Sequence, residues 1–378
     1  MNYRVPFNKP FIIGKELYYI SQAVLGGKIA GDGTFTRRCN EFLEQAFHAR
    51  KVLLTHSCTA ALEIAAILCG LGPGDEVILP SFTFVSTANA FHLRGARLVF
   101  ADIRSDTLNI DETLLEDLIT PKTRAIVPVH YAGVACAMDA IMDLARRHDI
   151  FVIEDAAQAV SSKCGDRFLG TIGDIGAYSF HETKNFISGE GGAIVINNER
   201  FIERAEIIRE KGTNRSKFFR GETDKYTWVD IGSSYLPSEI VAAFLYAQLE
   251  NIDLITARRR EIFEHYAQSL APLAQRGLVR IPSLARDSQT NYHIFYMILE
   301  DEKTRNDLMD HLKTCGILAV FHYVPLHTSP MGISMGYTNG RLPVTESISG
   351  RLLRLPFYYE LTREDQDYVI DCIGSFFG

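Results

Sequence analysis

The sequence lacks the patterns that mark several common classes of cofactor and metal site. Its seven cysteines are scattered and include no C-x-x-C pair, so we expect neither a structural zinc site nor a disulfide framework. No G-x-x-x-x-G-K segment followed by Ser or Thr occurs, which excludes a P-loop. No G-x-G-x-x-G follows an N-terminal strand, which argues against a nicotinamide or flavin Rossmann domain. We expect no bound metal and a ligand that is held in another way.

Long apolar runs and an excess of basic residues are also missing. No run of about 18 apolar residues could span a membrane, and residues 1–7 lack the basic start and apolar core of a signal peptide. The formal net charge of −7 disfavours nucleic acid and anionic lipid as partners. We therefore expect a cytoplasmic protein without membrane or nucleic-acid partners, in which any anionic ligand meets a local pocket.

The first half of the chain, from residue 51 to about 197, alternates short β-branched runs with helical patterns. This alternation predicts an α/β fold with a mostly parallel central sheet between helices. The expected strands are 51–55, 76–80, 97–102, 124–130, 151–154, 175–180 and 193–197, and the expected helices between them are 59–69, 85–93, 112–119 and 138–148.

The second half has a different pattern. A helix is expected at 199–210, followed by a polar loop at 212–232 and a long helix from Ser238 through Gln268. Beyond it, strands at 292–299 and 318–323 and helices at 303–314 and 363–376 are typical of an α+β unit. With 378 residues, we expect a large domain at 1–245 and a smaller C-terminal domain at 246–378.

Three polar segments follow predicted strands, at the sheet edge where open α/β sheets bind ligands. They are Thr55–Ala61, Ile153–Gln158 and Ser179–Asn185. Each segment alone is more typical of a helix cap or a solvated charge than of a site. Together and in this order, they indicate one composite site.

The three segments resemble those of the fold type I, aspartate-aminotransferase-like enzymes that use pyridoxal 5'-phosphate (PLP), specifically the DegT/DnrJ/StrS family of nucleotide-sugar aminotransferases. Pro6-Phe7, the P-S-F-T-F run at 80–84 and the H-Y-x-P-L-H run at 322–327 extend the resemblance over nearly the whole chain. It implies a PLP-binding large domain, a smaller α+β C-terminal domain and a homodimer with shared active sites.

The resemblance assigns the cofactor-binding and catalytic roles to individual residues. Lys184 would bind the cofactor's aldehyde covalently and later move a proton between substrate and cofactor, which requires an amine that is neutral near pH 7. Asp155 would keep the pyridine nitrogen protonated, so that the ring accepts electrons. Gln158 would donate a hydrogen bond to the ring oxygen, and Phe84 would stack on the ring.

The resemblance places the cofactor phosphate at the end of the first strand. Thr59 and Ser179 would supply hydroxyls, and the backbone of Cys58 and Thr59 would supply N–H groups. Cys58 stands where the family usually has glycine, and we do not expect it to be a nucleophile. Ser234 stands where many relatives have an asparagine that reaches the phosphate of the neighbouring subunit.

The substrate expectation also comes from the resemblance. The S-F-H-x-x-K form, with His181, is typical of members that aminate C4 of the sugar. His322, Tyr323 and His327 are candidates for sugar contacts. The chain is most similar to members that use L-glutamate to convert dTDP-4-oxo-6-deoxy-D-glucose into dTDP-4-amino-4,6-dideoxy-D-galactose and 2-oxoglutarate, through the pyridoxamine form of the cofactor. Such members serve cell-surface polysaccharides such as enterobacterial common antigen, lipopolysaccharide or O-antigen.

Several alternatives remain open at this point. A C3 aminotransferase or one that forms the gluco epimer at C4 would carry nearly the same motifs. A sugar dehydratase of this fold would have histidine in place of Lys184, and a non-catalytic PLP-binding regulator usually carries an added basic DNA-binding segment. An NAD-dependent epimerase would need the missing glycine fingerprint.

Overall fold

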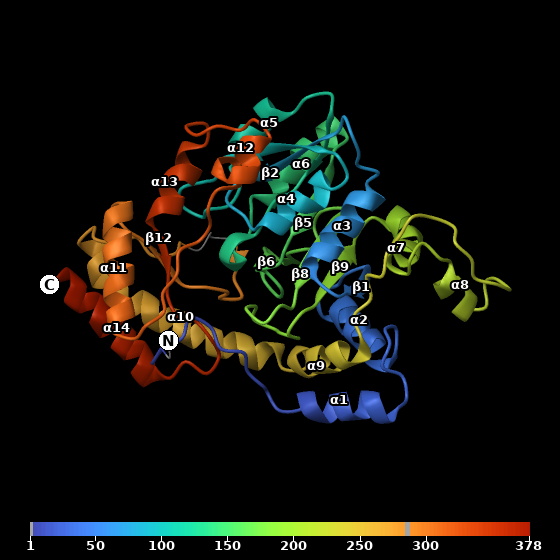
Figure 1. The fold of residues 1–378 in the computed structure, drawn as a ribbon, viewed down its shortest axis with the longest axis horizontal. Helices are drawn as coiled ribbons and strands as arrows, with labels where there is room; N and C mark the ends of the chain where they lie inside the picture. Colours follow the sequence, from blue (N-terminus) through green and yellow to red (C-terminus); the bar gives the residue numbers. More distant parts are fainter. Residues whose placement is uncertain (1–2, 284–287) are drawn as a thin grey trace.

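A seven-stranded sheet forms the centre of the protein in the computed structural model, which describes residues 3–283 and 288–378 (Figure 1). Its strands are β1 (Lys51–Thr55), β2 (Glu76–Pro80), β3 (Arg97–Ala101), β4 (Thr123–Ile126), β5 (Phe151–Asp155), β8 (Ile175–Ser179) and β9 (Gly192–Ile196). Their order is β1-β9-β8-β5-β4-β2-β3. In this sheet β9 is antiparallel to both of its neighbours, and every other adjacent pair is parallel. The expected mostly parallel sheet is confirmed.

Helices cover both faces of this sheet. They are α1 (Glu16–Leu25), α2 (Thr34–Ala46), α3 (Cys58–Leu68), α4 (Val85–His92), α5 (Leu115–Leu118), α6 (Met138–His148), α7 (Ile202–Arg209) and α9 (Glu239–Leu249). Alternate strand residues point to opposite faces. In β1, Leu53 therefore packs in the core with α3, α4 and α7, whereas Val52 and Leu54 pack in the core with α1, α2 and α9.

The C-terminal part builds a separate apolar core around a two-stranded antiparallel sheet, β11 (Tyr296–Ile298) and β12 (Leu352–Arg354). Around it lie α10 (Ile252–Gln275), α11 (Glu302–Thr314) and α14 (Arg363–Phe377) (Figure 1). Along α10, Ile255 belongs to the sheet-covering core and Ile262 to the C-terminal core. The domain division at residues 245/246 stays a prediction.

The remaining α-helices and strands are short, and the longest of them, α13, has nine residues. They are α8 (Arg215–Phe219), α12 (Pro330–Ser334), α13 (Pro343–Arg351), β6 (Lys163–Cys164), β7 (Arg167–Phe168) and β10 (Ser288–Gln289). The last three form a small antiparallel sheet. The segment that bears α8, at 212–232, extends away from the body of the molecule in Figure 1.

The long helix and one strand of the C-terminal part differ most from the sequence expectations. The long helix from Ser238 is broken into α9 and α10, which meet at an angle of 64°, because the Asn251 side chain donates to the Ala247 carbonyl at 2.8 Å and satisfies the end of α9. The expected strand at 318–323 is absent from the described structure. There, Val320 alone forms a bridge with Arg354, because the segment then turns toward the central sheet.

Within the described ranges, no single helix is long and apolar enough to cross a membrane, and only the bent pair α9 and α10 meets that length and composition when its two helices are combined. All seven cysteines lie in the described ranges, and none of them forms a disulfide.

Candidate active site

Asp155 is fixed in place at the end of β5. Its side chain is 5% exposed, and its Oδ2 accepts a hydrogen bond from Thr87 Oγ1 at 2.7 Å. Its Oδ1 accepts from the Ala157 N–H at 3.1 Å. Thr87 also shares a 3.0 Å hydroxyl contact with Thr83, so α4 and the loop before it hold the carboxylate from one side. A carboxylate held in this way offers a fixed negative charge to a cationic ring.

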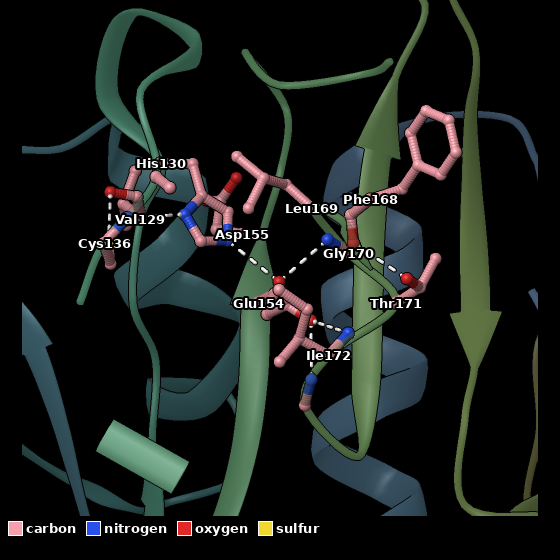
Figure 2. A network of polar contacts seen from close by, with 12 residues as sticks. Val129, His130, Cys136, Glu154, Asp155, Phe168, Leu169, Gly170, Thr171 and Ile172 are labelled. Atoms are coloured by element: carbon pink, nitrogen blue, oxygen red, sulfur yellow. Dashed lines mark hydrogen bonds and ion pairs between the residues drawn. The ribbon is translucent and has the colours of Figure 1, made fainter. Parts of the chain in front are cut away.

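A second buried network supports the same strand end, and Figure 2 shows it. Glu154 is fully buried and accepts four hydrogen bonds: from His130 Nε2 at 2.9 Å and from three N–H groups of the turn 170–173 at 2.6–2.8 Å. His130 Nδ1 accepts from the Cys136 N–H at 3.2 Å, which places the ring proton on Nε2. Because Glu154 directly precedes Asp155, this network fixes the backbone that carries the candidate catalytic carboxylate.

The N-terminus of α3 is a candidate anion site. Ser57 caps it by accepting from the Ala60 N–H at 3.1 Å, and the N–H groups of Cys58 and Thr59 have no intrahelical partner. Thr59 Oγ1 lies 2.8 Å from Ser86 Oγ, which adds hydroxyl groups to the same end. The donor set fits a phosphate ester, since amide and hydroxyl donors converge at the positive end of an eleven-residue helix.

Cys58 takes the position of the family's glycine without closing this helix end. The close approach is made instead by Gly192, where an added Cβ would lie 2.4 Å from the Cys58 nitrogen. Burial raises the pKa of the Cys58 thiol well above its usual range, Asp155 raises it further, and Lys184 opposes the shift only in part. The thiol is therefore neutral, and the expectation that it is not a nucleophile stays a prediction.

Lys184 lies in the turn that joins β8 to β9. Burial lowers the pKa of its amine and Arg354 lowers it further, whereas Cys58 and Asp155 act in the opposite direction. In the described chain, the Lys184 Nζ has no hydrogen-bond or ion-pair partner. The structure thus brings Lys184 into the electrostatic range of Asp155 and of the α3 end, with an amine that loses its proton more readily than a solvated lysine.

Gln158, which follows β5, and Tyr323, from the C-terminal part of the chain, meet beside this centre. Gln158 Oε1 accepts from the Ala132 N–H at 2.8 Å, and its Nε2 donates to the Tyr323 hydroxyl at 3.1 Å. Burial raises the pKa of Tyr323, so the phenol is neutral at physiological pH. The expected contact of Gln158 with a ring oxygen stays a prediction.

The histidines expected at the sugar end lie in different surroundings. His322 is buried with its Nδ1 3.0 Å from the Tyr131 hydroxyl, and burial lowers its pKa well below the usual range, helped by Arg354 and Lys184. His181 is partly exposed beside Thr183, at 3.0 Å. His327 is 1% exposed, and its ring nitrogens lie 2.7 Å from Ser81 and 2.9 Å from Glu346. Both ring nitrogens of His327 are thus occupied in the described structure, and the expected sugar contacts of His181, His322, Tyr323 and His327 stay predictions.

The other residues predicted to contact the cofactor are Phe84, Ser179 and Ser234. Phe84 precedes α4 and is 58% exposed, so a ring face is open for stacking. Ser179 is buried at the end of β8, where its Oγ accepts from the His181 N–H at 3.5 Å. Ser234 is exposed and pairs through its backbone with Glu210. Their contacts with a cofactor remain predictions.

Four residues of the site were missed from the sequence: Ser86, Thr87, His130 and Arg354. The sequence pointed to Ser86 and Thr87 in part, because both lie in the first turn of α4 directly after the P-S-F-T-F run. His130 and Arg354 follow no motif and come to the site through tertiary packing.

One further pattern in the chain, Gly332–Gly336, reads G-x-S-x-G, which occurs at the nucleophile of many hydrolases. Its Ser334 ends the five-residue helix α12 and donates to the Met331 carbonyl at 2.7 Å. No strand leads into this turn and its serine bonds no histidine in the described structure, so it is not a nucleophile elbow.

A fixed strand-end carboxylate, a lysine with a lowered pKa and an open helix end together suit an enzyme that holds a phosphate-bearing aldehyde cofactor. The class they define is that of the fold type I PLP aminotransferases.

The model of the DegT/DnrJ/EryC1/StrS aminotransferase family matches residues 11–374, and the chain belongs to this family. It is 32% identical to the spore coat polysaccharide biosynthesis protein SpsC of Bacillus subtilis, over 98% of this chain and 97% of SpsC. Among solved structures, the sugar aminotransferase Spr1654 of Streptococcus pneumoniae in its PLP form has a TM-score of 0.91 at 26% identity, covering 99% of this chain and 98% of that one.

A second solved structure, DesV of S. venezuelae in complex with a ketimine intermediate, has a TM-score of 0.89 at 30% identity, covering 99% of this chain and 98% of that one. Spr1654 is also known in a PMP form. The protein is thus a PLP-dependent sugar aminotransferase with PMP as the second form of its cofactor, and the expected fold, enzyme class and cofactor are confirmed.

Proposed function

We propose that this protein transfers the amino group of L-glutamate to C4 of dTDP-4-oxo-6-deoxy-D-glucose, giving dTDP-4-amino-4,6-dideoxy-D-galactose and 2-oxoglutarate for a cell-surface polysaccharide. The observation that carries the chemistry is Lys184, an amine of lowered pKa within reach of the Asp155 charge and the α3 end. His181, in the S-F-H-x-x-K segment, supports C4 over C3.

Each residue of the site would have a separate role in the reaction. When bound, PLP supplies an electron-accepting ring and carries the amino group between the two half-reactions. The N-terminus of α3 holds the phosphate, and Asp155, oriented by Thr87, holds a proton at the pyridine nitrogen. Lys184 Nζ takes the proton from the amino-bearing carbon of glutamate and later delivers a proton to C4 of the sugar.

We also propose a cytoplasmic homodimer in which Ser234 of one subunit donates to the phosphate site of the other. The exposure of Ser234 and of Phe84 supports a shared site, because both would otherwise face solvent. Light scattering in solution measures the subunit number, and a monomer at micromolar concentration would contradict the shared site.

Borohydride reduction of the holoenzyme, followed by peptide mapping, tests the role of Lys184. We expect the cofactor on the peptide that contains Lys184, and no stable label in Lys184→Arg. Label on any other lysine of the wild type would contradict the assignment.

Release of 2-oxoglutarate from L-glutamate tests the substrate. We expect turnover with dTDP-4-oxo-6-deoxy-D-glucose and much less with the corresponding 3-oxo sugar. NMR of the product distinguishes the galacto from the gluco amine. A preference for the 3-oxo sugar would place the protein with the C3 enzymes, and no release with either sugar would favour a non-catalytic regulator.

A further inference from the structure

Arg354 is a partly buried cation, and the described structure gives it no counter-ion. It ends β12, and its guanidinium carbon lies 4.6 Å from the centroid of the Phe7 ring. Its Nε is buried without a partner, and its one side-chain hydrogen bond in the described structure is a long one, 3.5 Å from a terminal nitrogen to the Phe321 carbonyl. No described carboxylate lies within ion-pair distance of it.

Two buried arginines of this protein, Arg259 and Arg209, have more partners. Arg259 donates from two nitrogens to the Tyr292 and His293 carbonyls, and Arg209 pairs with Asp32 at 2.7 Å. A guanidinium nitrogen that is buried without a partner, as Arg354 Nε is, is costly because the lost hydration is not replaced. Burial accordingly lowers the pKa of Arg354, and only the Tyr131 and Tyr323 hydroxyls oppose that effect.

The surroundings of Arg354 place it beside the Lys184 centre. Its backbone N–H donates to the Val320 carbonyl at 2.7 Å, two residues before His322. The Phe7 ring that it covers precedes Asn8, whose amide donates to the Glu182 carbonyl at 3.2 Å, in the same turn as Lys184. The contact with Phe7 and the charge effect of Arg354 on the Lys184 amine together place the guanidinium near this turn.

The missing partner is an oxyanion, since the planar guanidinium fork matches a carboxylate or a phosphate in two parallel hydrogen bonds. Both proposed substrates carry one. In glutamate, the α-carboxylate is one bond from the carbon that loses its amine, so it must lie close to Lys184. In the nucleotide sugar, the diphosphate is attached at C1, across the ring from the reacting C4.

We propose that Arg354 binds a carboxylate of the amino-acid donor and so selects an anionic amine for the first half-reaction. This inference rests on the proposed function, because it takes the donor to be an amino acid. It gives the isolated charge of Arg354 a partner that is present only while the donor is bound. The neutral sugar ring of the second substrate makes no such demand.

Titration calorimetry on the holoenzyme tests this with two probes: glutarate, which has two carboxylates and no amine, and dTDP, which has the diphosphate and no sugar. We expect Arg354→Gln to weaken glutarate binding at least tenfold and Arg354→Lys to weaken it less. Binding of dTDP should change by less than twofold. Arg363→Gln, at an exposed site on α14, is the matched control and should leave both affinities unchanged.

Unchanged glutarate binding in Arg354→Gln, or no glutarate binding by the wild type, would overturn the inference. A loss of dTDP affinity that exceeds the loss of glutarate affinity would also overturn it and assign the arginine to the diphosphate. Thermal unfolding of each variant checks folding, and Arg354→Lys keeps a cation in place if the glutamine variant does not fold.

The outcome is separable from that of the proposed function. If glutarate binding depends on Arg354 while no oxo sugar is aminated, the sugar assignment fails and the carboxylate site stands. If the sugar is aminated while glutarate binding is independent of Arg354, the sugar assignment stands and the carboxylate site at Arg354 fails. A stopped-flow measurement of the donor half-reaction, without sugar, should give a KM for L-glutamate that rises at least tenfold in Arg354→Gln.

Discussion

Thr87 shows how far the site depends on single side chains outside the recognised motifs. Its hydroxyl donates to Asp155 Oδ2 inside the protein, where little water competes for the bond. The carboxylate then has one orientation toward the place expected for the pyridine nitrogen. Asp155 supplies the carboxylate, and Thr87 fixes the orientation of that carboxylate.

Thr87→Val should therefore impair the enzyme without changing its shape. Loss of a hydrogen bond to a charged group costs about 1.5–3 kcal/mol, which corresponds to a loss of roughly 10- to 100-fold in kcat/KM or PLP affinity. Fluorescence titration with PLP and steady-state kinetics measure the two. Thr113→Val removes an equivalent 2.7 Å bond to Asp111 at an exposed site and should have no effect, so equal behaviour of the two variants would contradict the role of Thr87.

Lys184 should destabilise the apoprotein at neutral pH, because the folded state lowers the pKa of its amine. At a pH below the pKa of Lys184 in the folded state, the full free-energy cost of burying its charged amine is present. As the pH rises toward the unfolded value near 10.5 the folded form sheds its proton first, so the penalty disappears. We expect apo Lys184→Met to unfold at a higher urea concentration than the wild type at pH 7, and this advantage to vanish near pH 10.5.

The control for this pH series is Lys122→Met, which removes a solvent-exposed lysine. Its urea midpoint should follow that of the wild type at every pH. A Lys184→Met advantage that is constant with pH would show that the effect comes from packing and not from the charge.

At the scale of elements, the contact between the start of β9 and the start of α3 decides whether the anion site exists. Gly192 pairs with Thr55 in the sheet and lies directly against Ser57 and Cys58. A side chain at position 192 would push the helix end away from the sheet. The glycine that permits close approach is thus on the neighbouring strand and not at position 58.

Gly192→Ala should lower the free energy of unfolding by about 1–3 kcal/mol, as overpacked buried sites do, and should weaken PLP binding as well. Gly374→Ala in α14 has open space around its Cβ and should raise stability by about 0.5–1 kcal/mol. Urea unfolding measures both. Normal PLP affinity in a folded Gly192→Ala protein would contradict the assignment of the phosphate to this helix end.

Strong local patterns explain which elements were predictable. Strands such as 76–80 and helices such as 138–148 are found where the periodicity placed them. Helix α1 was missed because its apolar residues do not form one face: Leu17, Tyr18 and Leu25 are exposed while Glu16 is buried. The three strand-end segments were predictable for the same local reason, whereas Arg354 reaches the site only through β12 and the fold of the C-terminal part.

Across the whole molecule, two buried carboxylates attach the N-terminal segment to α9. Glu239 accepts from the N–H groups of Gly33, Phe35 and Thr36 at 2.7–3.0 Å and from the Thr36 hydroxyl. Glu16 accepts from the Ile13 and Gly14 N–H groups and from Gln248. These bonds replace ordinary helix caps and hold α1 and α2 against the sheet-covering layer.

Glu239→Gln should cost about 2–4 kcal/mol of unfolding free energy, because several buried N–H groups lose a charged acceptor. Glu261→Gln, on the exposed side of α10, should change stability by less than about 0.5 kcal/mol. Urea midpoints compare the two. Equal midpoints would mean that the N-terminal segment is held by its apolar contacts alone.

The antiparallel pairing of β1 with β9 has a consequence for the order of folding. Residues 51–55 pair with residues 192–196, so this part of the sheet closes only after the intervening chain has been brought together. Because Gly192 completes the anion-binding end of α3, cofactor capture during refolding should lag behind helix formation. The time course of cofactor absorbance during refolding would then report when β1 pairs with β9.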